Sequence, residues 1–205
     1  MGRSIELGFT EERVPPGTHI CYIFNDDAER RECISRFVQS GLKNGENVGY
    51  FVASLTPEKF LESLSTLGLD MHGVKDLLDV RPAEQVYMPD QTFQPDRMLA
   101  TLTPYHKHGI ERGCPGTRIS GEMEWALKGF PGSDRLIEYE ARINDNIVES
   151  PSTIICQYDA RIFSGETIFG VLSVHPMMII RGQVVRNPYY LTPAEYFRRH
   201  RRKEG

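Results

Sequence analysis

The stretch His19-Ile-Cys-Tyr-Ile-Phe24 is a short apolar run between Pro15-Pro16-Gly17 and Asn25-Asp26-Asp27. Residues 28–43 follow with apolar side chains at helical spacing, and Val48-Gly-Tyr-Phe-Val-Ala53 is a second, almost wholly apolar run. Prolines, glycines and aspartates at the borders mark the ends of these segments. A short apolar run, a periodic stretch and another short apolar run predict a strand, a helix and a parallel strand that is buried on both faces.

The same alternation continues outward from this unit. Further strands are expected over 77–81, 117–121 and 153–158, helices over 56–67, 95–111, 133–146 and 166–174, and a hairpin over 177–180 and 183–185. Pro104 should bend or break its helix, and Thr192-Pro-Ala-Glu195 opens a last helix as a capping box. The pattern predicts an α/β fold with three layers: a mostly parallel sheet, helices on both of its faces, and a C-terminal hairpin.

Length and composition fit one globular domain. The chain has 205 residues and a net charge of -4, and its four cysteines are scattered without a C-x-x-C pair. We therefore expect a single domain over 1–205, with a core over about 14–193 and a basic helix over 192–205. No apolar run approaches the roughly 18 residues of a membrane span, and no signal peptide is visible. These features predict a cytoplasmic protein that does not bind a membrane and has no disulfide framework. The acidic net charge makes nucleic acid an improbable partner.

The segment Gly41-Leu-Lys-Asn-Gly-Glu-Asn-Val-Gly-Tyr-Phe-Val52, with Gly68-Leu-Asp70, resembles the KaiC-type members of the RecA-like ATPases. That resemblance implies a phosphate loop before the first helix and paired catalytic glutamates after the second strand. Residues 24–32 instead lack the required glycines and lysine, and Ala53-Ser54-Leu55-Thr56 stands in place of the glutamates. We therefore predict a degenerate site that does not hydrolyse ATP, and a protein that is not an enzyme.

Four further blocks make the whole chain resemble the MEDS domain, the sensory domain of methanogens and methylotrophs. The blocks are His19-Ile-Cys21, Gly121-Glu-Met-Glu-Trp-Ala126, Cys156-Gln-Tyr-Asp159, and the run from His175-Pro176 to Asn187-Pro-Tyr-Tyr190. The resemblance implies a sensor of small molecules, such as simple hydrocarbon derivatives or C1 metabolites, in prokaryotic signal transduction or transcription regulation. It also implies a signalling protein as partner, either a histidine kinase or a regulator.

Histidines and cysteines in separate elements are candidates for a metal site. His19 and Cys21 share one face of a strand, and with Cys156 and His175 they could form a set of nitrogen and sulfur ligands. In the alternative interpretation the cysteines are small core residues and His19 is bonded to backbone. No other cofactor is predicted.

Polar and aromatic residues that follow the expected strands are candidates for a ligand pocket, because ligands of such sheets bind at the carboxyl ends of the strands. Glu122 and Glu124 flank the turn before Trp125, and could clamp a ligand or transfer protons. Alternatively, one glutamate caps a turn or pairs with Arg118 or Arg142. The predicted ligand-binding residues are His19, Cys21, Glu122, Glu124, Trp125, Cys156, Tyr158 and Tyr189. Asp159, which ends an apolar run, is interpreted as structural.

Two other functions remain open at this point. The RecA-like resemblance allows a residual nucleotide-binding protein without hydrolysis, and a degenerate ATPase domain can also serve as a docking module for a kinase or regulator. The basic run Arg198-Arg-His-Arg-Arg-Lys203 could bind an acidic partner or end a solvated helix. A homo-oligomer is compatible with each of these functions.

Overall fold

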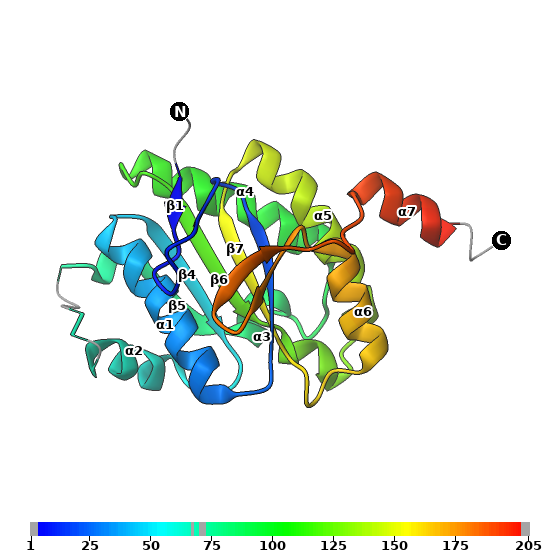
Figure 1. The fold of residues 1–205 in the computed structure, drawn as a ribbon, viewed down its shortest axis with the longest axis horizontal. Coiled ribbons are helices and arrows are strands. Elements are labelled where there is room, and N and C mark those ends of the chain that lie inside the picture. Colours follow the sequence, from blue (N-terminus) through cyan, green and yellow to red (C-terminus); the bar gives the residue numbers. More distant parts are fainter. Residues whose placement is uncertain (1–3, 67, 70–72, 202–205) are drawn as a thin grey trace.

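The protein is described by a computed structural model over residues 4–66, 68–69 and 73–201 (Figure 1). Its strands are β1 (Ile5–Glu6), β2 (Arg13–Val14), β3 (His19–Phe24), β4 (Asn47–Val52), β5 (Leu78–Pro82), β6 (Thr117–Glu122), β7 (Thr153–Asp159), β8 (Met177–Ile180) and β9 (Gln183–Arg186). Its α-helices are α1 (Asp27–Lys43), α2 (Pro57–Thr66), α3 (Ala83–Tyr87), α4 (Pro95–Glu111), α5 (Leu136–Glu149), α6 (Gly165–Val174) and α7 (Pro193–Arg201). Single 3-10 turns lie at η1 (Lys75–Leu77), η2 (Met123–Lys128) and η3 (Ser133–Arg135).

Seven strands form one sheet in the order β5-β4-β6-β7-β3-β8-β9. All neighbours are parallel except β8 and β9, which form an antiparallel hairpin. Arg181 and Gly182 turn this hairpin with positive φ angles, as a two-residue turn requires. The predicted α/β fold, with its mostly parallel sheet and C-terminal hairpin, is confirmed.

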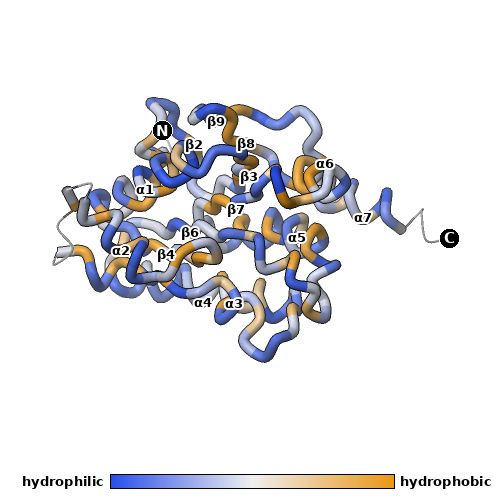
Figure 2. Tube along the Cα trace, turned by 90° about the horizontal axis from the view of Figure 1, so that it is seen from below, coloured by the Kyte–Doolittle hydropathy of each residue, from blue (hydrophilic) through white to orange (hydrophobic). Residues whose placement is uncertain are grey.

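Helices cover both faces of the sheet, and each face has its own core. One core joins the sheet to α1 and α2, and the other joins it to α3, α4, α5 and α6. Figure 2 shows the central strands running between these two groups of helices, with α7 directed away from the body. Because β7 and β3 lie in the middle of the sheet, their alternate side chains enter opposite cores.

A buried ion pair explains part of the segment 41–52. Gly41 on α1 has no room for a Cβ, because the side chain of Arg118 on β6 would lie 2.7 Å from it. Arg118 continues to the carboxylate of Glu46 and donates to the carbonyl of Phe37. Gly45, with φ of 71°, ends the helix between them. The glycines and glutamate of this segment therefore hold α1 against β4 and β6.

Some elements differ from expectation. Helix α4 continues through Pro104 without a break. The short pair β1 and β2, and helix α3, were not predicted, because two or five residues carry too little periodicity to be recognised. Asp70 and residues 202–203 of the basic run lie outside the described residues. Within the described part of the chain, no helix has the length and apolar character needed to cross a membrane.

Candidate functional site

Strand β7 contributes alternate side chains to two polar clusters on opposite faces of the sheet. Cys156 and Tyr158 point into the core beneath α5 and α6, whereas Gln157 and Asp159 point toward α1. All seven residues of the strand are buried. Each cluster must therefore satisfy its polar groups internally, because water does not reach them.

The cluster beneath α5 and α6, here called the His/Glu/Cys cluster, consists of His19, Glu140, Cys156 and His175. Their potential ligand atoms all lie within 4.8 Å of one another, and the side chains are 0–1% exposed. Oε2 of Glu140 lies 3.1 Å from Nε2 of His19 and 3.3 Å from Nε2 of His175. Sγ of Cys156 lies 3.5 Å from Nε2 of His19. Four elements, β3, β7, α5 and the α6–β8 junction, thus meet at one point.

Hydrogen bonds around the His/Glu/Cys cluster fix the orientation of both imidazole rings. The Nδ2 of Asn144 donates to the carbonyl of Val174 at 2.8 Å, so its Oδ1 faces Nδ1 of His19 at 3.3 Å. Nδ1 of His175 donates to the carbonyl of Val171 at 2.8 Å. Each ring therefore carries a proton on Nδ1, and a neutral ring presents the bare Nε2 lone pair to Glu140.

Burial shifts the pKa values of two members of the cluster toward their neutral forms. Burial, aided by the neighbouring His175, lowers the pKa of His19 to about 4, so this ring is neutral at physiological pH. Burial raises the pKa of the Cys156 thiol. Two acceptor atoms of the cluster have no hydrogen bond within the described residues: Oε2 of Glu140 and Nε2 of His175.

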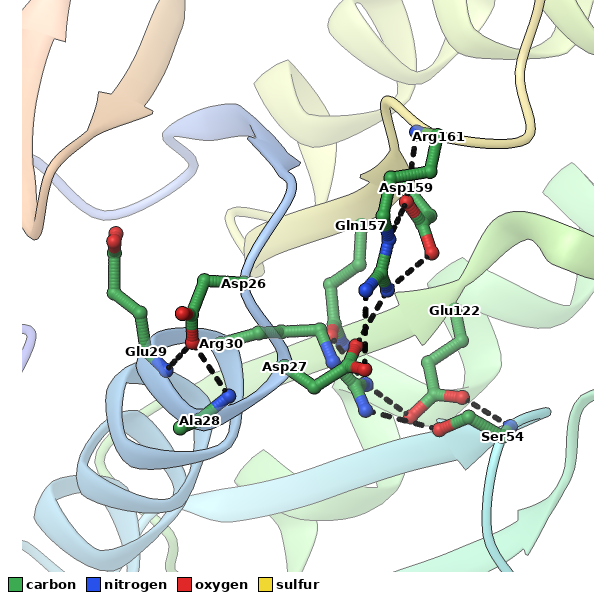
Figure 3. A network of polar contacts seen from close by, with 10 residues as sticks. All are labelled: Asp26, Asp27, Ala28, Glu29, Arg30, Ser54, Glu122, Gln157, Asp159 and Arg161. Atoms are coloured by element: carbon green, nitrogen blue, oxygen red, sulfur yellow. Dashed lines mark hydrogen bonds and ion pairs between the residues drawn. The ribbon is translucent and has the colours of Figure 1, made fainter.

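The cluster on the opposite face, here called the Arg30 network, surrounds the carboxylate of Glu122 with donors, while Nε of Arg30 has no hydrogen bond among the described residues (Figure 3). Arg30 on α1 donates to Glu122 at 2.8 Å, to Gln157 at 3.3 Å and to Ser54 at 3.0 Å. Glu122 also accepts from the hydroxyl of Tyr50 and from the backbone N–H groups of 53 and 54. Every carboxylate oxygen in this network has a donor, so the network has no position for an additional ligand.

The beginning of α1, where related folds bind phosphate, is occupied by the protein's own side chains. Asp26 accepts from the N–H groups of Ala28 and Glu29, both at 2.8 Å. Arg161 bridges Asp27 and Asp159 in front of this turn (Figure 3). Helix amides that would otherwise attract an anion are therefore used by a carboxylate.

The structure brings some predicted site residues together and separates others. His19, Cys156, His175 and Tyr158 converge, since the Tyr158 hydroxyl donates to Oε1 of Glu140 at 2.6 Å. Cys21 was predicted as a metal ligand, but its thiol is directed at the carbonyl of Met177, 3.7 Å away, and it is not part of the donor set among the described residues. Cys21 shares a face of β3 with His19 but lies outside the cluster, because the other members include Glu140 from α5 and His175 from the end of α6.

The remaining predicted residues do not form one pocket. Glu122 belongs to the Arg30 network and pairs with Arg30, not with Arg118 or Arg142 as the alternative interpretation had it. Trp125 is buried against Tyr87 and Phe93, with ring centroids 4.9 and 4.5 Å away.

Two others lie toward the surface. Glu124 is half-buried in η2. Tyr189 is 64% exposed in the segment after β9, apart from both clusters. The structure therefore does not bring the predicted ligand-binding residues into one lining, because they are divided between two faces of the sheet and the surface.

Two important residues were missed from the sequence. Glu140 and Arg30 are charged residues at positions that helical spacing assigns to buried stripes. Glu140 lies four residues after Leu136 and three before Ile143, and Arg30 lies four before Ile34. A charge inside an apolar stripe is costly unless it is paired or ligated, and this was the available signal.

An apolar groove lies at the carboxyl ends of β6 and β7. Its volume is about 570 Å³. The lining comes from η2, η3, α5 and the start of α6, and includes Ala126, Leu127, Phe130, Pro131, Leu136, Ile137, Phe163 and Thr167. Phe163 also contacts Tyr158 edge to face, with centroids 5.2 Å apart. The groove therefore adjoins the His/Glu/Cys cluster through two aromatic rings.

Comparison with known proteins identifies relatives of the chain. The family described as "MEthanogen/methylotroph, DcmR Sensory domain" (MEDS) matches residues 18–176. The transcriptional repressor DcmR of Methylorubrum extorquens is 29% identical over 161 residues, which cover 77% of this chain. The chain spans 57% of the length of that repressor.

Solved structures share the fold at low sequence identity. The KaiC-like protein PH0186 of Pyrococcus horikoshii is 14% identical, with a TM-score of 0.64 over 87% of this chain and 80% of that one. The flagellar accessory protein FlaH of Methanocaldococcus jannaschii is 12% identical, with a TM-score of 0.59 over 82% of this chain and 76% of that one. These similarities confirm the KaiC-like arrangement of the sheet and helices.

Proposed function

The chain belongs to the MEDS family of sensory domains, and from that premise we propose that it binds a small, largely apolar organic compound without transforming it. The observation that carries this proposal is the groove of about 570 Å³ at the carboxyl edge of the sheet. Most of its lining side chains are aliphatic or aromatic, with Ser133, Asp134 and Thr167 as polar members, and such a surface suits simple hydrocarbon derivatives. This edge is also where ligands of open α/β sheets bind.

The groove is connected to the interior by direct contacts. Phe163 lines the groove and packs on Tyr158, and the Tyr158 hydroxyl bonds to Glu140 in the His/Glu/Cys cluster. A compound that displaces Phe163 would therefore alter the packing of α5 and α6 on the sheet. This gives a route from ligand binding to a change at the surface of the two helices.

A nucleotide-binding function is less well supported by the same structure. Asp26 occupies the first amides of α1, and Asp27 and Asp159 place further carboxylates beside them. A nucleotide phosphate would meet negative charge where related folds supply glycine amides and a lysine. We therefore favour ligand sensing over ATP binding, with output through a regulatory partner, in keeping with the repressor among the relatives.

The proposal is tested by a thermal-shift screen of the purified chain against halomethanes, small alcohols, methylated amines, and ATP with Mg²⁺. A compound that binds the folded state raises the melting temperature, and the rise grows with the logarithm of its concentration once that exceeds Kd. We expect a small organic compound to raise it and ATP to leave it unchanged. Isothermal titration then measures the affinity of the compound that scores.

Two matched variants locate the binding site. Leu127→Glu places a charge in the lining of the groove, and should abolish the shift. Leu61→Glu makes the same change in a different surface groove, between α2 and β5, and should preserve it. Stabilisation by ATP alone, or an organic compound whose shift survives Leu127→Glu, would contradict the proposal.

A further inference from the structure

We infer that the His/Glu/Cys cluster is a binding site for one transition-metal ion of the zinc class. Neutral imidazole, thiolate and carboxylate are the protein ligands that such ions prefer. The four residues come from separate elements, His19 from β3, Cys156 from β7, Glu140 from α5 and His175 from the end of α6, yet their donor atoms lie within 4.8 Å of one another. Separate elements rarely direct four such atoms at one point inside a core without a shared partner.

Three of the six distances between the donor atoms match the edges of a tetrahedral site. Bond lengths of about 2.0–2.1 Å to nitrogen and oxygen, and about 2.3 Å to sulfur, give edges of about 3.3 Å between N and O and about 3.6 Å between N and S at a tetrahedral angle. The observed edges are 3.1 and 3.3 Å from Oε2 of Glu140 to the two imidazoles. The edge from His19 to Sγ of Cys156 is 3.5 Å. These three edges suit a zinc-sized ion, and the other three separations are at most 4.8 Å.

Charge favours the same occupant. A carboxylate and a thiolate carry two negative charges, and a divalent cation cancels them, so the filled site is neutral inside a core with no water access. The metal-free arrangement instead points the lone pairs of two imidazole nitrogens at one carboxylate oxygen. Oε2 of Glu140 and Nε2 of His175 then have no hydrogen bond within the described residues. A metal ion would satisfy both atoms at once.

The surrounding hydrogen bonds are those of a prepared metal site. Asn144 and the carbonyl of Val171 hold the Nδ1 protons of the two histidines, so both Nε2 atoms are free to coordinate. Tyr158 donates to Oε1 of Glu140, which leaves Oε2 as a single-atom ligand. With four protein ligands, a tetrahedral ion has no position for a reactive water. The inferred ion therefore joins β3, β7, α5 and α6, and does not catalyse hydrolysis.

The test is metal analysis of the chain purified without chelators, followed by reconstitution with Co²⁺ alone. We expect one metal ion per chain by elemental analysis. In the Co²⁺ form we expect tetrahedral visible bands and a thiolate-to-cobalt charge-transfer band. Cys156→Ala should abolish the charge-transfer band, and Glu140→Gln should weaken metal retention during dialysis at least about tenfold, in line with the loss of a primary ligand.

Cys21→Ala is the matched control, because Cys21 faces Cys156 on the neighbouring strand and is equally buried. This variant should keep both the metal and the charge-transfer band. A chain that binds neither Zn²⁺ nor Co²⁺ while its circular dichroism shows it folded would overturn the inference, as would metal binding that survives Cys156→Ala and Glu140→Gln. The thermal-shift screen against organic compounds tests the groove independently of the metal site. Leu127→Glu changes the groove lining and leaves the four inferred metal ligands in place.

Discussion

The two buried polar clusters of this sheet differ in how their charges are balanced. In the Arg30 network, Glu122 receives four hydrogen bonds, from Arg30, Tyr50 and two backbone N–H groups. In the His/Glu/Cys cluster, Glu140 receives one hydroxyl proton on Oε1, and Oε2 faces two imidazole nitrogens. Both carboxylates are buried beside the same strand, β7. The carboxylate of Glu122 is satisfied by the protein itself, whereas Oε2 of Glu140 has no hydrogen-bond donor among the described residues.

The difference separates structural polar groups from binding groups. A buried carboxylate that is satisfied by its neighbours holds elements together, and losing it leaves an unpaired charge. A buried carboxylate surrounded by electron-pair donors contributes to folding only through what it binds. The predictions below test this contrast by changing the same type of residue on the two faces.

Glu122→Ala should have the largest effect. It leaves the guanidinium of Arg30 buried without its carboxylate, and we expect a loss of about 3–5 kcal/mol in the free energy of unfolding. Urea denaturation followed by circular dichroism measures this loss. Glu124→Ala, two residues along in η2 and half-buried, is the control and should stay close to the wild type. Equal losses in both variants would show that the Arg30 network does not stabilise the fold.

Acid should weaken the Arg30 network in a defined pH range. Burial would raise the pKa of Glu122, but Arg30, Tyr50 and the backbone donors outweigh burial and lower it. Because the unfolded chain then takes up the proton first, this contribution to stability is complete above the unfolded pKa of about 4.3 and is lost as pH falls through the lower folded pKa. The stability difference between the wild type and Glu122→Gln should therefore shrink in acid. A difference that is constant from pH 6 to pH 3 would contradict the pairing.

Glu140→Gln should have the smallest effect on the metal-free chain, and the opposite sign. The glutamine amide can donate to Nε2 of His19 or His175, which the carboxylate cannot do. We expect the free energy of unfolding, measured in urea with a chelator present, to rise by up to about 1 kcal/mol. Added Zn²⁺ should then stabilise the wild type and not the variant. A loss in chelator as large as that of Glu122→Ala would mean that the two clusters are alike.

Much of this architecture could be predicted from the sequence. The strand, helix and strand of residues 19–53, the hairpin around Gly182 and the helix after Thr192 follow from apolar runs, turn residues and caps. The sequence grouped His19, Cys21, Cys156 and His175 as candidate ligands, and the structure places three of them together, all but Cys21. These residues were grouped by residue type. The alternation of side chains along a strand gave the face of the sheet on which each strand residue lies.

The sequence could not supply the distances or the partners. Cys21 shares a face with His19, but only the packing of β8 shows that its thiol turns to Met177. Glu140 and Arg30 fell inside predicted helices and were not singled out, because an apolar stripe predicts burial and does not show which charged residue inside it has a partner. Which helix covers which face depends on long-range packing, so the place of Glu140 beside His19, Cys156 and His175 became visible only in three dimensions.

The enclosure of the His/Glu/Cys cluster has a consequence for time scale. Its side chains are 0–1% exposed, so an ion can enter or leave only when α5 or α6 moves off the sheet. The lifetime of an occupant is then limited by the opening rate of the protein and not by diffusion in solvent. The inferred site would therefore keep its ion when the concentration of free metal changes briefly. It would gain or lose the ion only when such a change lasts longer than the time between openings of the protein.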